Sequence, residues 1–211
     1  MKAIIVRSIS ITAVLLAAIF FIGCGGGVGN ANSGNVAANT ATNTTGNTSN
    51  TTTEAPSIYP PLATAIAQGD LEALDGTHFT PADRKGNVVL LNLWGVWCGP
   101  CRNEMPHLVE MQDKYRDRGF QVIGLNIGDD ERQPESIDKI KQFAGEMKLN
   151  YELVRVDHDV QEAIVGVTKF DGVPQSVLID RGGHLRGVFL GGGSSVVNKM
   201  KETVDKVVNE Q

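Results

Sequence analysis

Two cysteines separated by two residues carry the clearest chemical signal in this chain. Cys98 and Cys101 follow an apolar run over 88–93, which is typical of a strand buried on both faces, and precede apolar residues at helical spacing over 105–115. A thiol at the start of a helix lies beside unpaired N–H groups and the positive end of the helix dipole, which favour the thiolate. Because the thiolate attacks disulfides, we predict that Cys98 is an exposed nucleophile and Cys101 a buried resolving thiol.

Structural zinc is the main alternative for two cysteines at this spacing. Such a site needs a second pair of ligands at comparable spacing. Cys24 is the only other cysteine, and the four histidines are scattered singly along the chain. They are His78, His107, His158 and His184. The sequence therefore predicts no metal site and no cofactor, and it favours a redox pair.

Glu104 is the candidate base for the second cysteine. A buried thiol resists losing its proton, so Cys101 needs a base nearby before it can attack. Glu104 follows Cys101 by three residues and so shares its face of the predicted helix. The alternative is an acidic residue placed early in the helix to complement the dipole.

A wider pattern around the cysteines resembles a known family. Residues 97–101, Trp-Cys-Gly-Pro-Cys, are similar to the thioredoxin active site. With Asn92-Leu93-Trp94 before it and Glu104-Met105-Pro106 after it, the segment resembles the TlpA/ResA-type thiol-disulfide oxidoreductases, which are membrane-tethered thioredoxin-like proteins outside the cytoplasm. Residues 71–76 resemble the N-terminal hairpin of that family, and the Gly-Val-Pro of 172–174 leads into a further matching strand. The resemblance covers roughly residues 70 to 208.

The resemblance implies an α/β thioredoxin fold, with a central mixed β-sheet flanked by helices and an N-terminal β-hairpin. Seventy-two residues lie between Cys101 and Pro174, whereas two helices and one strand with short loops need roughly 40 to 45. The surplus fits the strand–helix unit that the family inserts. The patterns predict helices over 60–68, 134–147, 159–165 and 194–209, and strands over 71–74, 77–80, 88–94, 121–127, 151–156, 176–180 and 185–190.

The resemblance also assigns roles around the cysteines. Pro174 matches the cis-proline of the family, which faces the cysteines and lets the backbone of Val173 pair with a bound peptide. In cytosolic thioredoxins a buried aspartate acts as the base, but Asn92 stands at the matching position here and cannot accept a proton. The glutamate that matches Glu104 is regarded as functional in the family. Beside Cys98, Trp97 is expected to form an apolar lip for docking.

The front of the chain predicts export and lipidation. Lys2 and Arg7 precede an uncharged stretch over 8–23 that is shorter than the roughly 20 apolar residues of a spanning helix, so residues 1–23 are predicted to be a signal peptide. Residues 21–24, Phe-Ile-Gly-Cys, resemble a bacterial lipobox with Cys24 as the lipidated residue. The alternative is an ordinary secretory cleavage site beside an incidental cysteine.

Composition separates a tether from a folded domain. Residues 25–53 are rich in Asn, Thr and Gly and contain no charged or aromatic residue, so they cannot bury enough apolar surface to order themselves. We therefore divide the chain into a signal peptide (1–23), a lipid attachment site with a disordered tether (24–57) and a thioredoxin-like domain (58–211). As a random coil the tether has a typical reach of roughly 30 Å.

Charge limits the partners that we expect. The chain has 19 basic and 24 acidic residues, and removal of the signal peptide takes two basic ones, leaving 17 − 24 = −7. A negative domain argues against nucleic acid. We expect a monomer whose partners are protein disulfides, a membrane thiol–disulfide electron donor and the membrane that holds the lipid anchor.

The predicted function is that of an extracytoplasmic protein-disulfide reductase, with apocytochrome c during haem attachment as one candidate substrate. Gly99-Pro100 between the cysteines resembles reducing members of the thioredoxin class, which predicts a potential below about −200 mV. A thiol-dependent peroxidase is one alternative, although residues 95–97 before Cys98 lack the threonine that a peroxidatic Thr-x-x-Cys requires. A copper-binding chaperone is another, with His184 as the candidate partner of the cysteines.

Overall fold

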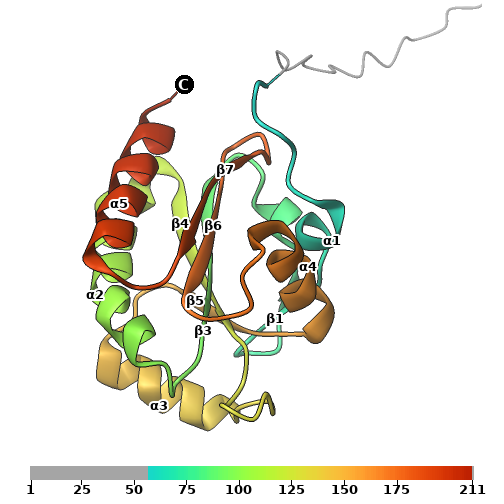
Figure 1. Cartoon of the computed structure of the whole chain (residues 1–211), viewed down its shortest axis with the longest axis vertical. Helices are drawn as coiled ribbons and strands as arrows, with labels where there is room; N and C mark the ends of the chain where they lie inside the picture. The colour runs from blue at the N-terminus through green and yellow to red at the C-terminus, as the bar shows by residue number, and fades with distance from the viewer. Residues whose placement is uncertain (1–56, 211) are drawn as a thin grey trace, which may run out of the picture. The chain divides into compact units, whose positions relative to one another are not determined.

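The computed structural model describes residues 57–210, in which a seven-stranded sheet has the strand order β2-β1-β5-β4-β3-β6-β7 (Figure 1). The predicted signal peptide, Cys24 and all but the last residue of the predicted tether lie outside the described residues. The strands are β1 (Leu71–Ala73), β2 (His78–Phe79), β3 (Val88–Trp94), β4 (Phe120–Asn126), β5 (Glu152–Val156), β6 (Gln175–Ile179) and β7 (Leu185–Leu190).

The sheet is mixed, as the family resemblance implied. The three central parallel strands are β3, β4 and β5, while β1 and β6 pair antiparallel to β5 and β3 respectively. At the two edges, β2 pairs with β1 and β7 pairs with β6, both antiparallel. Every residue of β3 is buried, which agrees with the prediction that the strand before the cysteines is covered on both faces.

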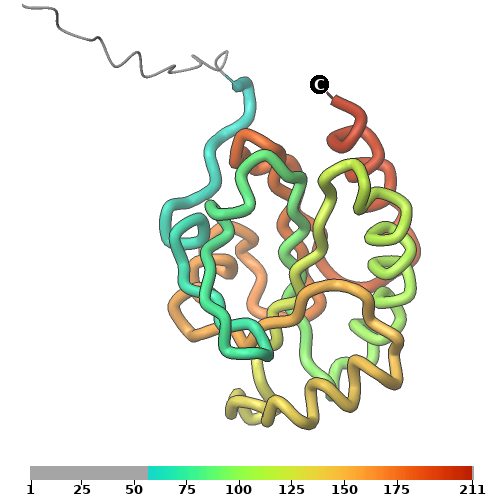
Figure 2. The backbone as a smooth tube through the Cα atoms, turned by 180° about the vertical axis from the view of Figure 1, so that it is seen from behind, coloured from blue at the N-terminus to red at the C-terminus, as the bar shows by residue number. Residues whose placement is uncertain are grey.

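Helices cover both faces of the sheet (Figures 1 and 2). The helices are α1 (Thr64–Ala67), α2 (Gly99–Tyr115), α3 (Ile137–Met147), α4 (His158–Thr168) and α5 (Ser194–Asn209). On one face, Val89 and Leu91 of β3 share an apolar cluster with residues of α1 and α4. On the other, Val88 and Leu90 cluster with α2 and α5, and Trp94 clusters with α3. The period-2 alternation of β3 therefore divides the core into two layers.

The inserted unit consists of α3 and β5. They lie between the β3–α2–β4 unit and the α4–β6–β7–α5 unit, and β5 extends the sheet beyond β4. The long interval between Cys101 and Pro174 is thus filled as the sequence predicted.

Three helix boundaries differ from the sequence prediction. α3 begins at Ile137 rather than at residue 134, because the hydroxyl of Ser136 accepts the backbone N–H of Lys139 and so caps the helix there. α1 is shorter than predicted, because Pro61 forms a β-bridge with His184 instead of entering the helix. α4 is longer, from a start capped by Asp157 to Thr168.

Candidate active site

The cysteine pair lies where β3 gives way to α2. β3 ends at Trp94, α2 begins at Gly99, and Cys98 is the N-cap residue of the helix. Cys98 and Cys101 are joined in a disulfide with their Cα atoms 5.3 Å apart. The backbone N–H of Cys101 donates to Sγ of Cys98 over 3.1 Å. The Cys98 sulfur thus receives one of the free N–H groups at the positive end of the helix dipole.

The prediction that Cys98 is exposed is wrong for this disulfide form. Only 3% of its surface is accessible, and Cys101 is 1% exposed. The reason is that the pair belongs to an apolar cluster with Trp94 and Met105, against which Val173 also packs. A partner therefore reaches Cys98 at a protected site rather than on an open surface.

Glu104 lies one turn further along α2 and is only 1% exposed. The side-chain amide of Asn92 donates to Oε1 of Glu104 over 2.6 Å and to the hydroxyl of Ser176 over 3.0 Å. Asn92 and Ser176 are direct partners across β3 and β6, so the register of the sheet places this polar group under α2. Ser176 was not among the predicted site residues, although a polar residue within a strand that is buried throughout could have indicated a polar partner.

The electrostatics of Glu104 suit proton transfer near neutral pH. Burial raises the pKa of Glu104 to about 7, against the lowering effect of the hydrogen bond from Asn92. A carboxyl with such a pKa can both accept and release a proton at the pH where thiols are used. Cys101 and Glu104 are spaced i, i+3 on α2 and are both buried, so the two side chains share one face of the helix.

The loop that carries Pro174 adjoins the cysteines. The Val173–Pro174 peptide bond is cis, in agreement with the family resemblance. The carbonyl of Pro174 accepts the N–H of Gly191 over 2.8 Å, which joins this loop to the end of β7. Gly192 packs so closely against the carbonyl of Pro100 that a β-carbon there would clash with it. The turn after β7 therefore forms one side of the site.

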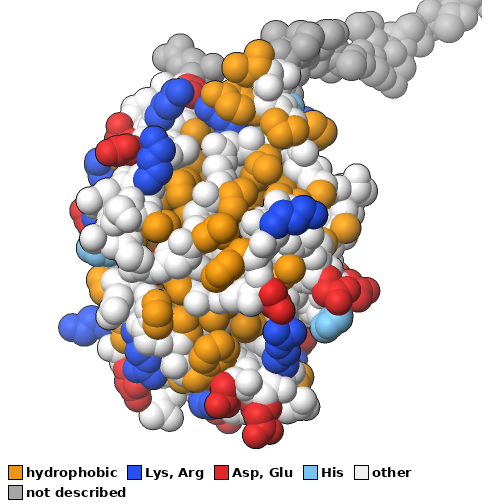
Figure 3. All heavy atoms as spheres, viewed as in Figure 1, with side chains coloured by type: hydrophobic (Ala, Val, Ile, Leu, Met, Phe, Trp, Pro, Cys, Tyr) orange, Lys and Arg blue, Asp and Glu red, His pale blue; other side chains and the backbone are white. Residues whose placement is uncertain are grey.

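Trp97 provides the exposed apolar surface beside the cysteines. Its side chain is 47% exposed, and its indole N–H donates to the carbonyl of Gly128 over 3.0 Å. Val188 and Leu190 of β7 are also partly exposed, at 37% and 39%. Figure 3 shows apolar side chains gathered down the middle of this face of the molecule, the face on which β7 lies in Figure 1. Trp94, in contrast, is fully buried and stacks on Phe143.

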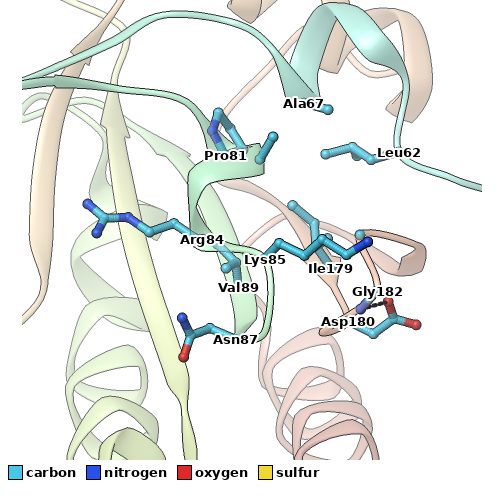
Figure 4. A pocket seen from close by; sticks show the side chains of 12 residues that line it. Leu62, Ala67, Pro81, Arg84, Lys85, Asn87, Val89, Ile179, Asp180 and Gly182 are labelled. Atoms are coloured by element: carbon cyan, nitrogen blue, oxygen red, sulfur yellow. Dashed lines mark hydrogen bonds between the residues drawn. The ribbon is translucent and has the colours of Figure 1, made fainter. Parts of the chain in front are cut away.

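His184 and an apolar pocket near the start of β3 both lie away from the cysteines. His184 lies at the opposite end of β6 from Pro174, where its Nδ1 is 3.1 Å from Oδ1 of Asp180. Residues 57–210 contain no cluster of three or more His, Cys, Asp or Glu side chains that could hold a metal ion. An apolar pocket near the start of β3, lined by Leu62, Val89 and Ile179 among others, lies at the far end of the strand from the cysteines (Figure 4).

The fold and the site together define a thioredoxin-like thiol–disulfide oxidoreductase. The family model Redoxin matches residues 42–207, and the chain belongs to this family. It is 28% identical over 134 residues to the thiol-disulfide oxidoreductase ResA of Geobacillus thermodenitrificans, covering 61% of this chain and 72% of that protein. It is 33% identical over 112 residues to ResA of Bacillus anthracis, covering 53% of this chain and 60% of that protein.

A solved structure shares the fold. A thioredoxin-family thiol:disulfide interchange protein of Chlorobium tepidum has a TM-score of 0.58 and 24% identity, covering 74% of this chain and all of that one. The family match and the ResA relatives support a protein of the ResA/TlpA type with thiol–disulfide oxidoreductase activity. Within residues 57–210, no helix has the length and apolar character needed to cross a membrane.

Proposed function

We propose that this protein is a membrane-tethered, extracytoplasmic reductase of protein disulfides that works through Cys98 and Cys101. The observation that carries the proposal is the cysteine pair at the N-terminus of α2, with the buried carboxyl of Glu104 one turn away. The helix terminus favours the thiolate of the first cysteine, and the carboxyl serves the second.

The reaction moves two electrons from the reduced cysteine pair to the partner. The Cys98 thiolate attacks a partner disulfide, forms a mixed disulfide and releases the first partner sulfur as a thiolate. Cys101 then gives its proton to Glu104 and attacks Sγ of Cys98, which releases the second partner sulfur and leaves the Cys98–Cys101 disulfide. A membrane thiol–disulfide protein supplies the electrons that restore the dithiol.

Partner docking is assigned to the surface around the cysteines. Trp97 offers an exposed aromatic side chain, and Val173 before the cis-proline has a backbone that can pair with an extended peptide. The exposed side chains of Val188 and Leu190 continue this apolar surface along an edge strand. An extended segment with apolar side chains next to its disulfide is the partner that this surface fits.

The direction of electron flow is tested by equilibration against glutathione. Gly99-Pro100 contributes no charged group that would further stabilise the Cys98 thiolate, so the reduced form is not strongly favoured. We expect a potential below about −200 mV, as for reducing members of this class. A potential near −120 mV would make the protein an oxidase of thiols instead.

Partners are identified by trapping. In a Cys101→Ser variant the mixed disulfide on Cys98 has no internal attacker, so partners should accumulate covalently bound to the full-length protein in cells. The matched Cys98→Ser variant should trap none. Recovery of exported proteins with reducible cysteine pairs, apocytochrome c among them, would support the reductase role. Equal trapping by both variants would contradict it.

Membrane attachment is assigned to Cys24, which the sequence places in a lipobox. Mass spectrometry of the mature protein should show a diacylglyceryl group on this residue, and Cys24→Ser should abolish it. An unmodified Cys24 in the wild-type protein would rule out the lipid anchor. Gly25 follows it instead of the aspartate that retains some lipoproteins at the inner membrane, so an outer-membrane location fits if the cell has two membranes.

A further inference from the structure

Buried polar side chains gather beside Asn92, the hydrogen-bond partner of Glu104, over the middle of β4. Gly124 of β4 pairs directly with Asn92 of β3, and its missing side chain lets neighbouring side chains approach the strand closely. A β-carbon at Gly124 would lie 2.7 Å from Cδ2 of Leu153, 3.0 Å from Nε1 of Trp94 and 3.2 Å from the ring carbon Cε2 of Tyr151. Asn92 and Trp94, both of β3, therefore come together with Tyr151, which is distant from them in the sequence.

Three polar atoms of these side chains lack a hydrogen-bond partner within residues 57–210. They are Oδ1 of Asn92, Nε1 of Trp94 and the hydroxyl of Tyr151, and all three are buried. Buried polar atoms are hydrogen-bonded in the great majority of cases, to protein or to ordered water. Three such atoms together, one acceptor and two donors, provide the partners that one buried water molecule requires.

Glu104 is the ionisable group that these unpartnered polar atoms can influence. Its carboxyl is bonded to Asn92, and burial and then the charge of Glu104 raise the pKa of Tyr151, so the phenol stays protonated and remains a donor. Asn92 is uncharged and also donates to the hydroxyl of Ser176, and the cysteine pair precedes Glu104 on α2. No cation among the described residues contributes to the charge balance of Glu104.

We propose that Tyr151 is a positioning residue for Glu104. Its hydroxyl, with the indole N–H of Trp94, donates through a bridging water and so stabilises the ionised carboxyl without a cation. The inference rests on the proposed function, in which Glu104 is the base for Cys101. It adds that Tyr151 helps to set the pKa of that base. Tyr151 lies in the connection between α3 and β5, so the inserted unit supplies part of the site.

The test is a titration of the Glu104 carboxyl by carbon-13 NMR in the oxidised protein, in which the cysteines do not titrate. Tyr151→Phe removes only the hydroxyl, and we expect the pKa of Glu104 to rise by about one unit, the size of one lost hydrogen bond to a charged group. Tyr115→Phe is the matched control. The Tyr115 hydroxyl donates to Asp205 between α2 and α5, so this control should leave the Glu104 pKa unchanged.

A Glu104 pKa that stays the same or falls in Tyr151→Phe would overturn the inference. The release of partner from the mixed disulfide gives the second readout, whose pH midpoint should move upward with the pKa. In the Glu104→Gln background, Tyr151→Phe should no longer change the pH profile. If the pKa moves as expected but Glu104→Gln leaves release rates unchanged, the positioning role of Tyr151 stands and the proposed role of Glu104 as a base fails.

Discussion

Two buried glutamates of this domain differ in whether a cationic side chain pairs with them. Glu104 is 1% exposed and Glu135 is 4% exposed, and each accepts a hydrogen bond from an asparagine amide, Asn92 over 2.6 Å and Asn126 over 2.8 Å. Nζ of Lys139 lies 2.9 Å from Oε1 of Glu135, an ion pair without hydrogen-bond alignment. Glu104 has no ion-pair partner within residues 57–210.

The difference separates a structural acid from one that can transfer protons. Glu135 lies in the loop after β4, where Asn126 also accepts the N–H of Gly128, so its charge and hydrogen bonds hold that loop. Glu104 is buried without a cation, and its pKa of about 7 follows from that burial. Burial alone therefore does not distinguish the two carboxyls, whereas burial without a compensating charge beside a cysteine pair makes Glu104 the candidate for proton transfer.

The largest expected effect is on the release of partner from the mixed disulfide. Glu104→Gln should slow release by about 100-fold or more at pH 8, because the variant removes the general base for Cys101. Formation of the mixed disulfide by Cys98 should change much less, because the helix terminus already favours that thiolate. Stopped-flow measurements with a model disulfide separate the two steps. Glu135→Gln is the matched control. An equal loss of release rate in both variants would show that the two glutamates do not differ in this role.

Glu104 should also make stability depend on pH. Its pKa is about 7 in the folded protein and 4.5 ordinarily, so the folded state binds the extra proton between these values. The contribution of Glu104 to the free energy of unfolding should therefore be most favourable below about pH 4.5 and fall by about 3 kcal/mol as pH rises to about 7. Urea unfolding of the oxidised protein should show Glu104→Gln more stable than wild type at pH 8. A lower stability of this variant at pH 8 would contradict the claim that burying the ionised Glu104 carboxyl destabilises the folded protein.

A smaller change is expected at Glu135. Glu135→Gln keeps an acceptor for Asn126 but loses the ion pair with Lys139, whose side chain is 53% exposed. The free energy of unfolding at pH 7 should fall by about 1 kcal/mol, because a half-exposed ion pair contributes little. The same urea titration measures this change. A gain in stability like that of Glu104→Gln would show that the two carboxyls are equivalent.

Local patterns predicted much of the fold. The strands at 88–94 and 185–190 and the helix at 194–209 have the predicted bounds, because continuous apolar runs and helical periodicity depend on neighbouring residues alone. The start of α3 was wrong because Pro134 fits a first helical turn as well as a loop. Only the contacts of that loop decide in favour of the cap at Ser136.

Spacing along the chain predicted that Cys98, Cys101 and Glu104 lie together at the start of one helix, and the structure places them there. The surroundings of these residues were not predicted. The burial of Cys98 depends on loops that arrive from residues 170–193. The groups around Glu104 depend on sheet register, which pairs Asn92 with Ser176 and with Gly124. Tyr151 enters through the inserted unit, and nothing local in the sequence places it there.

The pH dependence of partner release tests most directly whether Glu104 is the base for Cys101. Single-turnover release from the Cys98 mixed disulfide should be measured from about pH 5 to 9 in wild type and Glu104→Gln. In the wild type the rate should rise through a midpoint near pH 7, where the carboxyl loses its proton. That midpoint should be absent from the variant, which should also be slower throughout the upper part of the range. Identical profiles and rates in the two proteins would contradict the role of Glu104 as the base.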